Sequence, residues 1–216
     1  IQEMLSLPLG ASEVTLEEMT VLYEGLVSGE HWTFPSLLNI PGKVSQMEAP
    51  AADRPTLLIS EIRDVNGVLL YQAEPSINEV ATDATPAVVR GILSNVVAYG
   101  TGKRAARAVV TGDAIVPLGG KTGTTNSYRN AVFMGFVPIA TDVGYTTTDG
   151  YTLGVYVGYD DNRKMARGNL RVAGSSGALP AWVLTAQGLN ERGLLGEPDE
   201  EADEAVWPLV LDKSLR

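Results

Sequence analysis

The sequence predicts an α+β fold with an antiparallel sheet. Two segments with a helical apolar period carry their own start and stop signals, near residues 15–29 and 85–100. Three extended segments follow between residues 118 and 159, and their short connections favour antiparallel pairing of chain neighbours. A last helical segment begins near residue 179.

The first helix begins at a capping box formed by Thr15 and Glu18, and Gly29 is suited to end it. Its apolar stripe consists of Leu16, Met19, Tyr23 and Leu26. Residues 30–56 contain five prolines or glycines and little periodicity, which predicts a loop. Residues 57–63 and 68–71 flank Asn66-Gly67, a strong signal for a β-hairpin.

The second helix is expected to open at Thr85-Pro86 and to close at Gly100. Its expected buried face consists of Val88, Val89, Ile92, Leu93, Val96 and Val97.

The extended segments differ in character. Residues 118–125 are glycine-rich, residues 131–137 are apolar throughout as in a central strand, and residues 152–159 end at a polar turn, Asp160-Asp161-Asn162. The last helix is expected over residues 179–188, with Pro180 in its first turn.

Composition excludes several functions. The 216-residue chain has a net charge of −10, which disfavours nucleic acid and anionic membranes as partners. Six of the 26 acidic residues lie in residues 197–204, within an acidic tail over residues 191–216 that has a short apolar end at 205–211. With no Cys and a single His, the chain has no thiol nucleophile and no Cys or multi-His metal site, and no cofactor is implied.

The candidate for chemistry is Lys121-Thr122-Gly123 on the glycine-rich strand. K-T-G is one of three signatures of the serine enzymes that act on β-lactams, together with S-x-x-K and S-x-N. Such a short motif also arises by chance, as a strand with a solvated lysine, so its surroundings decide its meaning.

Those surroundings resemble a known family. Residues 119–138 resemble the K-T-G region of class A (bifunctional) penicillin-binding proteins, where T-T-N, a Y-R pair and an apolar strand ending near proline follow the motif. Further segments look like the same family in the same order: residues 9–15, 97–105, 157–160 and 174–182. The resemblance, from about residue 5 to 190, implies the C-terminal part of a transpeptidase domain with the helix–sheet–helix layering shared with serine β-lactamases.

The chain also departs from the family pattern. It contains no S-x-x-K, and Ser76-Ile77-Asn78 fits S-x-N at the wrong place in the order. The resemblance therefore implies that the nucleophilic serine, its lysine and S-x-N precede Ile1, with a glycosyltransferase domain and a membrane anchor further upstream. On this basis we expect residues 1–190 to be an incomplete domain that exposes apolar surface and is inactive alone.

The resemblance assigns roles to the K-T-G strand of a peptidoglycan D,D-transpeptidase, which binds D-Ala-D-Ala stem peptides and β-lactams. Lys121 would stabilise negative charge and assist proton movement, the backbone N–H of Thr124 would serve the oxyanion, and Thr122, Gly123, Thr124 and Thr125 would bind substrate. Strand alternation places Lys121 and Gly123 on one face and Thr122 and Thr124 on the other. Tyr128 and Arg129 are candidates for the cleft rim.

Several residues carry open alternatives. His31 is expected to be solvated or packed rather than catalytic, and Trp32, Trp182 and Trp207 to be core anchors. Two basic groups could be solvated or could contact an anionic wall polymer: Lys103, Arg104 and Arg107, and Arg163, Lys164, Arg167 and Arg171. The whole chain could also be a non-catalytic module that keeps the fold for binding or assembly. The resemblance implies a place on the extracytoplasmic (periplasmic) face of the bacterial membrane.

Overall fold

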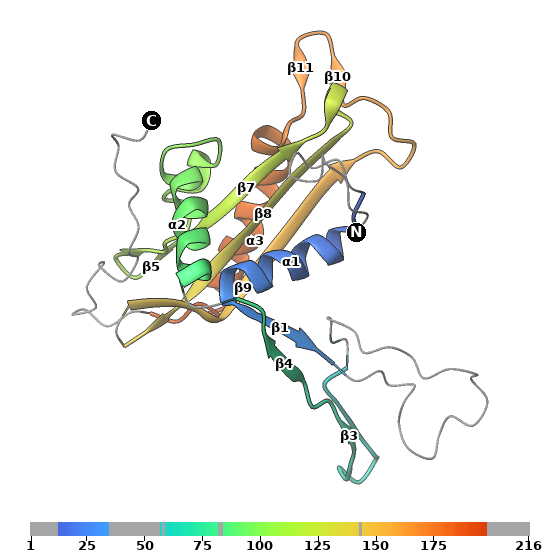
Figure 1. The fold of residues 1–216 in the computed structure, drawn as a ribbon, viewed down its shortest axis with the longest axis vertical. Helices are drawn as coiled ribbons and strands as arrows, with labels where there is room; N and C mark the ends of the chain where they lie inside the picture. The colour runs from blue at the N-terminus through green and yellow to red at the C-terminus, as the bar shows by residue number, and fades with distance from the viewer. Residues whose placement is uncertain (1–12, 35–56, 58, 82–83, 143, 198–216) are drawn as a thin grey trace.

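The computed structural model describes residues 13–34, 57, 59–81, 84–142 and 144–197. Its centre is a three-stranded antiparallel sheet in the order β7-β8-β9, with β7 at one edge (Figure 1). The strands are β7 (Gly119–Thr124), β8 (Asn130–Thr141) and β9 (Gly144–Gly158). The antiparallel meander and the central position of residues 131–137 are therefore confirmed.

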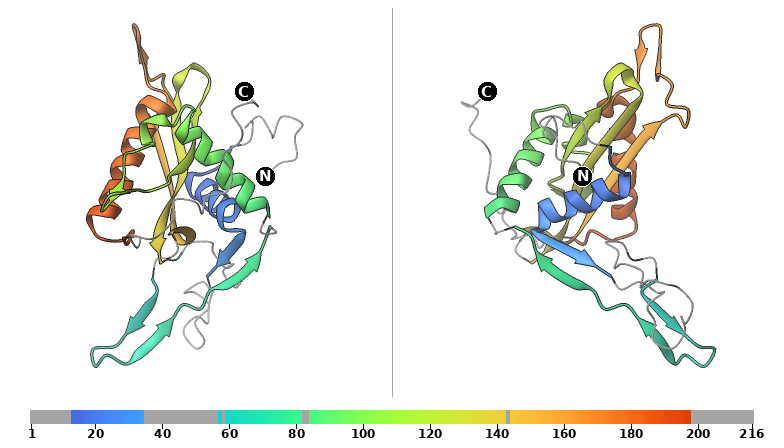
Figure 2. Two further views of the ribbon diagram at one scale, coloured as in Figure 1. Left: turned by 90° about the vertical axis from the view of Figure 1, so that its left-hand side faces the viewer. Right: turned by 45° about the vertical axis from the view of Figure 1, so that its right-hand side comes forward.

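Helices cover both faces of the sheet. The α-helices are α1 (Leu16–Ser28), α2 (Ala84–Ala98) and α3 (Leu179–Glu191). Seen along the sheet, α3 lies on one side and α1 and α2 lie on the other (Figure 2). The predicted α+β class, with an antiparallel sheet packed between helices, is confirmed.

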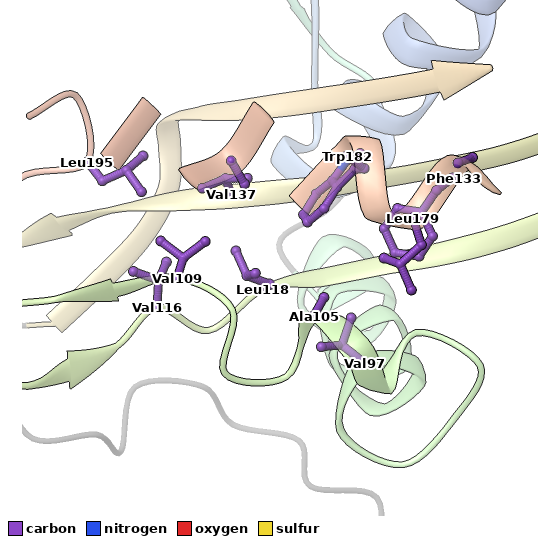
Figure 3. Close-up of a cluster of buried hydrophobic side chains, with 12 residues drawn as sticks. Val97, Ala105, Val109, Val116, Leu118, Phe133, Val137, Leu179, Trp182 and Leu195 are labelled. Atoms are coloured by element: carbon purple, nitrogen blue, oxygen red, sulfur yellow. The ribbon is translucent and has the colours of Figure 1, made fainter. Parts of the chain in front are cut away.

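The main core lies between the sheet and α3 (Figure 3). Trp182 is fully buried, packs edge-to-face on Phe133 with ring centroids 5.0 Å apart, and donates its indole N–H to the carbonyl of Leu153 at 3.0 Å. Leu195, within the expected tail, is also buried in this core, and its carbonyl accepts from Ala140. The acidic run beyond residue 197, the apolar end at 205–211 and Trp207 lie outside the described residues.

The helix ends follow the sequence signals. Thr15 and Glu18 form the capping box of α1, and Gly29 ends the helix with φ +86°, a left-handed conformation that favours glycine. In α2, Leu93 and Val97 are buried as expected, but Val88 and Ile92 are each 47% exposed. The expected buried face was too wide because α2 lies beside the edge strand β7, and within the described part of the chain no element covers its outer side.

Part of the predicted loop after α1 is a strand. β1 (Glu30–Thr33) pairs with β4 (Ser76–Glu79), and β2 (Glu61–Arg63) pairs with β3 (Leu69–Gln72) around the expected Asn66-Gly67 turn. These four strands form an arm that projects from one end of the body (Figure 1). The carbonyl of Gly29 accepts from Val80 at 2.8 Å and from Ala81 at 3.3 Å, so both ends of the arm meet at the end of α1.

Short elements complete the described fold: η3 (Lys103–Ala105) follows α2, and β5 (Val110–Thr111) pairs with β6 (Ala114–Ile115) before β7. Two others lie beside the end of β7. A 3-10 turn, η4 (Asn126–Tyr128), follows β7, and a π-helical turn, η5 (Gly174–Ala178), leads into α3. Between β9 and η5, β10 (Ala166–Arg167) and β11 (Leu170–Arg171) form a small hairpin at the end of the molecule opposite the arm (Figure 1). None of the helices in the described part of the chain has the length and hydrophobicity needed to cross a bilayer.

Candidate active site

The K-T-G motif lies in a strand next to residues 131–137, as expected, and this strand, β7, is at the edge of the described sheet rather than inside it. Lys121 is paired with Met134 and Gly123 with Val132 of β8, in a regular register without a bulge. The Gly119-Gly120 end of β7 is buried, whereas Lys121 and Thr124 are exposed. The motif is therefore the accessible part of an otherwise covered strand.

The side chains of the motif alternate between the two faces of the sheet. Lys121 and Gly123 line a groove together with residues of α1. On the other face, the hydroxyl of Thr124 accepts a hydrogen bond from the backbone N–H of Gly174 at 2.9 Å. Thr122 reaches beyond the sheet edge to Thr101, with the two hydroxyl oxygens 2.7 Å apart. Lys121, Gly123 and Thr124 thus share a strand but do not share a face.

The side chains of the motif point to different faces of the sheet, but the backbone N–H and C=O groups of Thr122 and Thr124 point in one direction. The N–H of Thr125 donates to the carbonyl of Asn130 at 3.0 Å, continuing the β7–β8 register. Because backbone groups alternate along an antiparallel pair, Thr124 and Thr122 direct their N–H and C=O groups away from β8, toward the open edge. These groups can pair with an extended ligand added as a strand.

Lys121 holds an accessible positive charge at this edge. Its ammonium donates to the carbonyl oxygen of Thr122 at 2.8 Å, one of the outward-directed acceptors. Among the described residues, no carboxylate lies within ion-pair distance of Lys121. The charge is therefore available to an anionic ligand at the edge of β7.

The groove beside Lys121 has a volume of about 660 Å³. Its apolar wall includes Met19 and Tyr23 of α1 and Val132 and Met134 of β8. Burial raises the pKa of Tyr23 above its ordinary value. The full lining is Glu13, Val14, Thr15, Leu16, Met19, Tyr23, Lys121, Thr122, Gly123, Thr125, Asn130, Val132, Met134 and Tyr156.

Two glycines are required by close packing around the motif. A Cβ on Gly123 would collide with a methyl group of Val132, so this glycine has a packing role as well as any role in substrate approach. A Cβ on Gly174 would lie 2.6 Å from the carbonyl oxygen of Gly123 and 2.7 Å from that of Val132. Both neighbours are backbone atoms of the sheet, so only glycine lets η5 approach β7 this closely.

The remaining predicted residues lie near the end of β7 or far from it. Thr125 closes the turn to β8, its hydroxyl oxygen accepting from the N–H of Asn130 at 2.9 Å. Tyr128 and Arg129 follow directly, at the base of the β10–β11 hairpin. Ser76 and His31 lie in the arm, in β4 and β1, away from the motif.

Two sequence expectations about these outer residues were wrong. His31 is part of a strand rather than a proline-rich loop. Trp32 also belongs to β1, is only half-buried, donates its indole N–H to Glu30 and packs on Phe34, so it anchors the arm and not the core. Among the described residues, no group of three or more His, Asp or Glu side chains is arranged to hold a metal ion.

Thr101 and Gly174 are site neighbours that residue chemistry alone did not single out. Each belongs to a segment that resembled the family, residues 97–105 and 174–182. The structure places both segments against β7, which gives those distant segments a common location.

Comparison with known proteins supports the family resemblance. No protein-family model matches the chain. Penicillin-binding protein 1A of Aquifex aeolicus is 32% identical over 178 residues, which is 82% of this chain and 19% of that protein. Penicillin-binding protein 1A of Rickettsia bellii is 30% identical, over 84% of this chain and 21% of that protein. Penicillin-binding protein 4 of Bacillus subtilis is 32% identical, over 49% of this chain and 14% of that protein.

A similar solved structure is the D,D-transpeptidase domain of a peptidoglycan glycosyltransferase from Eggerthella lenta, with 21% identity, a TM-score of 0.49, and coverage of 84% of this chain and 33% of that one. The chain spans about a fifth of the length of the 1A proteins that it matches. Over that fifth, as the K-T-G region and its neighbouring segments indicated, this chain is a homologue of the penicillin-binding proteins.

Proposed function

We propose that this chain is the K-T-G-bearing part of a peptidoglycan D,D-transpeptidase, which cross-links stem peptides by acyl transfer through a serine that this sequence does not contain. One observation carries the proposal. The exposed end of an edge strand presents a lysine charge and the outward backbone groups of Thr122 and Thr124 beside a groove, at the position of the K-T-G motif.

The roles proposed for the motif use this geometry. An extended D-Ala-D-Ala peptide pairs with the open edge at Thr122 and Thr124. The N–H of Thr124 stabilises the oxyanion that forms at the attacked carbonyl. Lys121 stabilises the terminal carboxylate and assists proton movement, and the hydroxyl hydrogen of Thr124 remains free to donate because its oxygen is the acceptor for Gly174.

The groove supports a further element of the proposal. Its wall of Met19, Tyr23, Val132 and Met134 is apolar and open beside the K-T-G strand. An apolar wall of this kind is suited to packing against another protein segment. We infer that the segment bearing S-x-x-K packs here and brings its serine to the edge of β7.

The family resemblance also suggests the setting. The complete protein would act at the extracytoplasmic face of the membrane, in the periplasm, held by an anchor and joined to a glycosyltransferase domain outside this sequence. It would be acylated by β-lactam antibiotics; the name of its relatives states penicillin binding for them.

Labelling with fluorescent penicillin tests the proposal. The 216-residue chain alone is expected to form no stable covalent adduct, because it has no S-x-x-K. The full-length product of the same gene is expected to form a stoichiometric adduct. Replacing Lys121 with alanine in that product should slow labelling, whereas Lys103→Ala, which removes an exposed positive charge outside the motif, should not.

Two results would contradict the proposal. A stoichiometric adduct on any serine of this chain, Ser76 included, would mean that the nucleophile has been misplaced. A full-length protein that folds but never forms an adduct would favour the alternative, a non-catalytic module that keeps the fold for binding or assembly.

A further inference from the structure

A basic hairpin, defined here as residues 163–171, projects from the end of the K-T-G strand. It contains β10 and β11 and lies beyond the tip of β7 (Figure 1). The N–H of Met165 donates to the carbonyl of Tyr128 at 2.8 Å, and the side chain of Met165 is buried. The base of the basic hairpin is therefore fixed to η4, the turn that directly follows the motif.

Two arginines of this hairpin rest on aromatic rings. The guanidinium carbon of Arg163 lies 3.9 Å from the ring centroid of Tyr159, and that of Arg171 lies 5.4 Å from the ring centroid of Tyr128. One N–H of Arg171 also donates to the hydroxyl of Tyr128 at 3.5 Å. A guanidinium held over a ring in this way has further N–H groups that can donate to a planar carboxylate. The two stacks are linked, because Arg129, next to Tyr128, donates to the carbonyl of Asn162, next to Arg163.

The positive charges of the basic hairpin are mostly uncompensated. Lys164 and Arg167 are exposed, and their side chains make no hydrogen bond or ion pair with the described residues. Arg163 faces Asp161, but at 3.8 Å and with both side chains more than 60% exposed, an ion pair worth little. This concentration of positive charge stands out in a chain whose net charge is −10.

The backbone around the stacks is held in an unusual conformation. Ser127, Tyr128 and Asn162 have φ values of 62°, 56° and 53°, in the left-handed region. Non-glycine residues other than Asn and Asp are uncommon there and persist where surrounding contacts impose the conformation, often at binding sites. Here the conformation of Tyr128 places its ring beneath Arg171 and its carbonyl against Met165.

We propose that the basic hairpin binds a side-chain carboxylate of the peptide substrate, outside the groove and beyond Thr124. This inference rests on the proposed function. An extended peptide paired with the open edge of β7 advances about 3.3 Å per residue, so a few residues carry it past Thr124 toward η4 and the hairpin. The hairpin therefore selects acidic stem peptides over neutral ones of the same length.

Nuclear magnetic resonance of the full-length product of the same gene, with threonine and arginine selectively labelled, provides the test. The probes are a pentapeptide that ends in D-Ala-D-Ala and carries one glutamate, and the same peptide with glutamine. Both should shift the amide signals of Thr122 and Thr124. The glutamate peptide should bind about 3- to 5-fold more tightly, the range of a single exposed charge contact, and should also shift the Nε–H signals of Arg163 and Arg171.

Matched variants separate a local contact from a general charge effect. The double variant Arg163→Gln/Arg171→Gln should abolish the preference for the glutamate peptide. Arg192→Gln removes a positive charge at the far end of α3 and should leave the preference intact. Arg171→Lys keeps the positive charge but has no planar group over the ring of Tyr128. This variant should keep only part of the preference for the glutamate peptide.

The outcomes distinguish this inference from the proposed function. If both peptides shift Thr124 equally and bind equally, the role of the hairpin is overturned while the proposed function stands. If neither peptide shifts Thr124, the proposed function fails for this strand. An equal loss of preference in Arg192→Gln, or binding of inorganic polyphosphate to the hairpin without binding of the glutamate peptide, would also overturn the inference.

Discussion

The hydroxyl oxygen of Thr124 accepts the backbone N–H of Gly174 at 2.9 Å and so joins the end of the K-T-G strand to the turn that leads into α3. The two residues are 50 positions apart in the sequence. The bond fixes the rotamer of Thr124 and leaves its hydroxyl hydrogen directed elsewhere. A residue proposed to bind substrate is therefore also held by the body of the fold.

This contact predicts a difference between two substitutions of Thr124. Thr124→Val keeps the shape but leaves the N–H of Gly174 without its acceptor, which should lower the free energy of unfolding by about 1 kcal/mol. Thr124→Ser keeps the hydroxyl and should lower it by much less. Chemical denaturation of the 216-residue chain measures both, and equal losses for valine and serine would show that the bond contributes nothing.

Gly174→Ala adds only one methyl group but should strongly lower the free energy of unfolding. The added methyl group would lie 2.6 Å from the carbonyl oxygen of Gly123, and neither that backbone nor Val132 can move without disturbing the sheet. We expect a loss of about 2 kcal/mol in the free energy of unfolding.

Gly188→Ala is the matched control for this substitution. Gly188 lies inside α3, where an added methyl group would meet open space, so alanine should stabilise the helix by up to about 1 kcal/mol. Thermal unfolding of both variants decides the matter. A stable Gly174→Ala variant would mean that η5 can move away from β7.

In the full-length product, Lys121→Ala should slow acylation by a β-lactam about 10- to 100-fold. The substitution removes a charge-assisted contact worth roughly 1.5–3 kcal/mol in the transition state. Lys121→Arg should restore the rate only in part, because its charge is spread over a planar group. Stopped-flow acylation gives the rates, and a wild-type rate in Lys121→Ala would remove the catalytic role from this motif.

Glu24 predicts a pH-dependent change in stability. Burial in α1 raises the pKa of its carboxyl group, an effect that the nearby charge of His31 partly offsets. A raised pKa in the folded state means that the charged form is disfavoured by folding, so the penalty is absent below the unfolded pKa and appears as pH rises through the folded one.

Glu24→Gln should therefore raise the melting temperature at about pH 7 and leave it unchanged near pH 3.5. Because the side chain is only half-buried, we expect a gain of less than about 0.5 kcal/mol, or roughly 1–2 °C. Glu17→Gln, on the exposed first turn of the same helix, should show no such gain at neutral pH. A gain of equal size at both pH values would assign the effect to helix propensity instead.

The features predicted correctly from the sequence are those set by interactions between residues close together in the chain. Thr15 and Gly29 mark the ends of α1 because a capping box and a left-handed glycine act within one helical turn. Asn66-Gly67 turns the chain between β2 and β3 for the same reason, with the carboxylate of Asp64 accepting from the N–H groups of Asn66 and Val68. Alternation also assigned Lys121 and Thr124 to opposite faces correctly.

Contacts between segments far apart in the sequence could not be predicted from those short-range signals. Glu30–Thr33 become a strand only because Ser76–Glu79 lie beside them, and nothing local in either segment specifies the partner. Val88 and Ile92 fit the apolar stripe of α2, but the position of the helix beside an edge strand leaves them exposed. The contact of Gly174 with Thr124 likewise depends on how η5 folds back onto the sheet.

Val80 and Ala81 both donate to the carbonyl of Gly29. The segment between Gly29 and Val80, residues 30–79, is therefore a detour that begins and ends at one place in the body of the fold. The chain leaves the body and re-enters it at the same point, so α1 and α2 would be neighbours even if the detour were shorter. Changes in the length of this detour are thus uncoupled from the spacing between α1 and β7. A lineage could rebuild the arm for a new contact while the strand that carries Lys121 keeps its place.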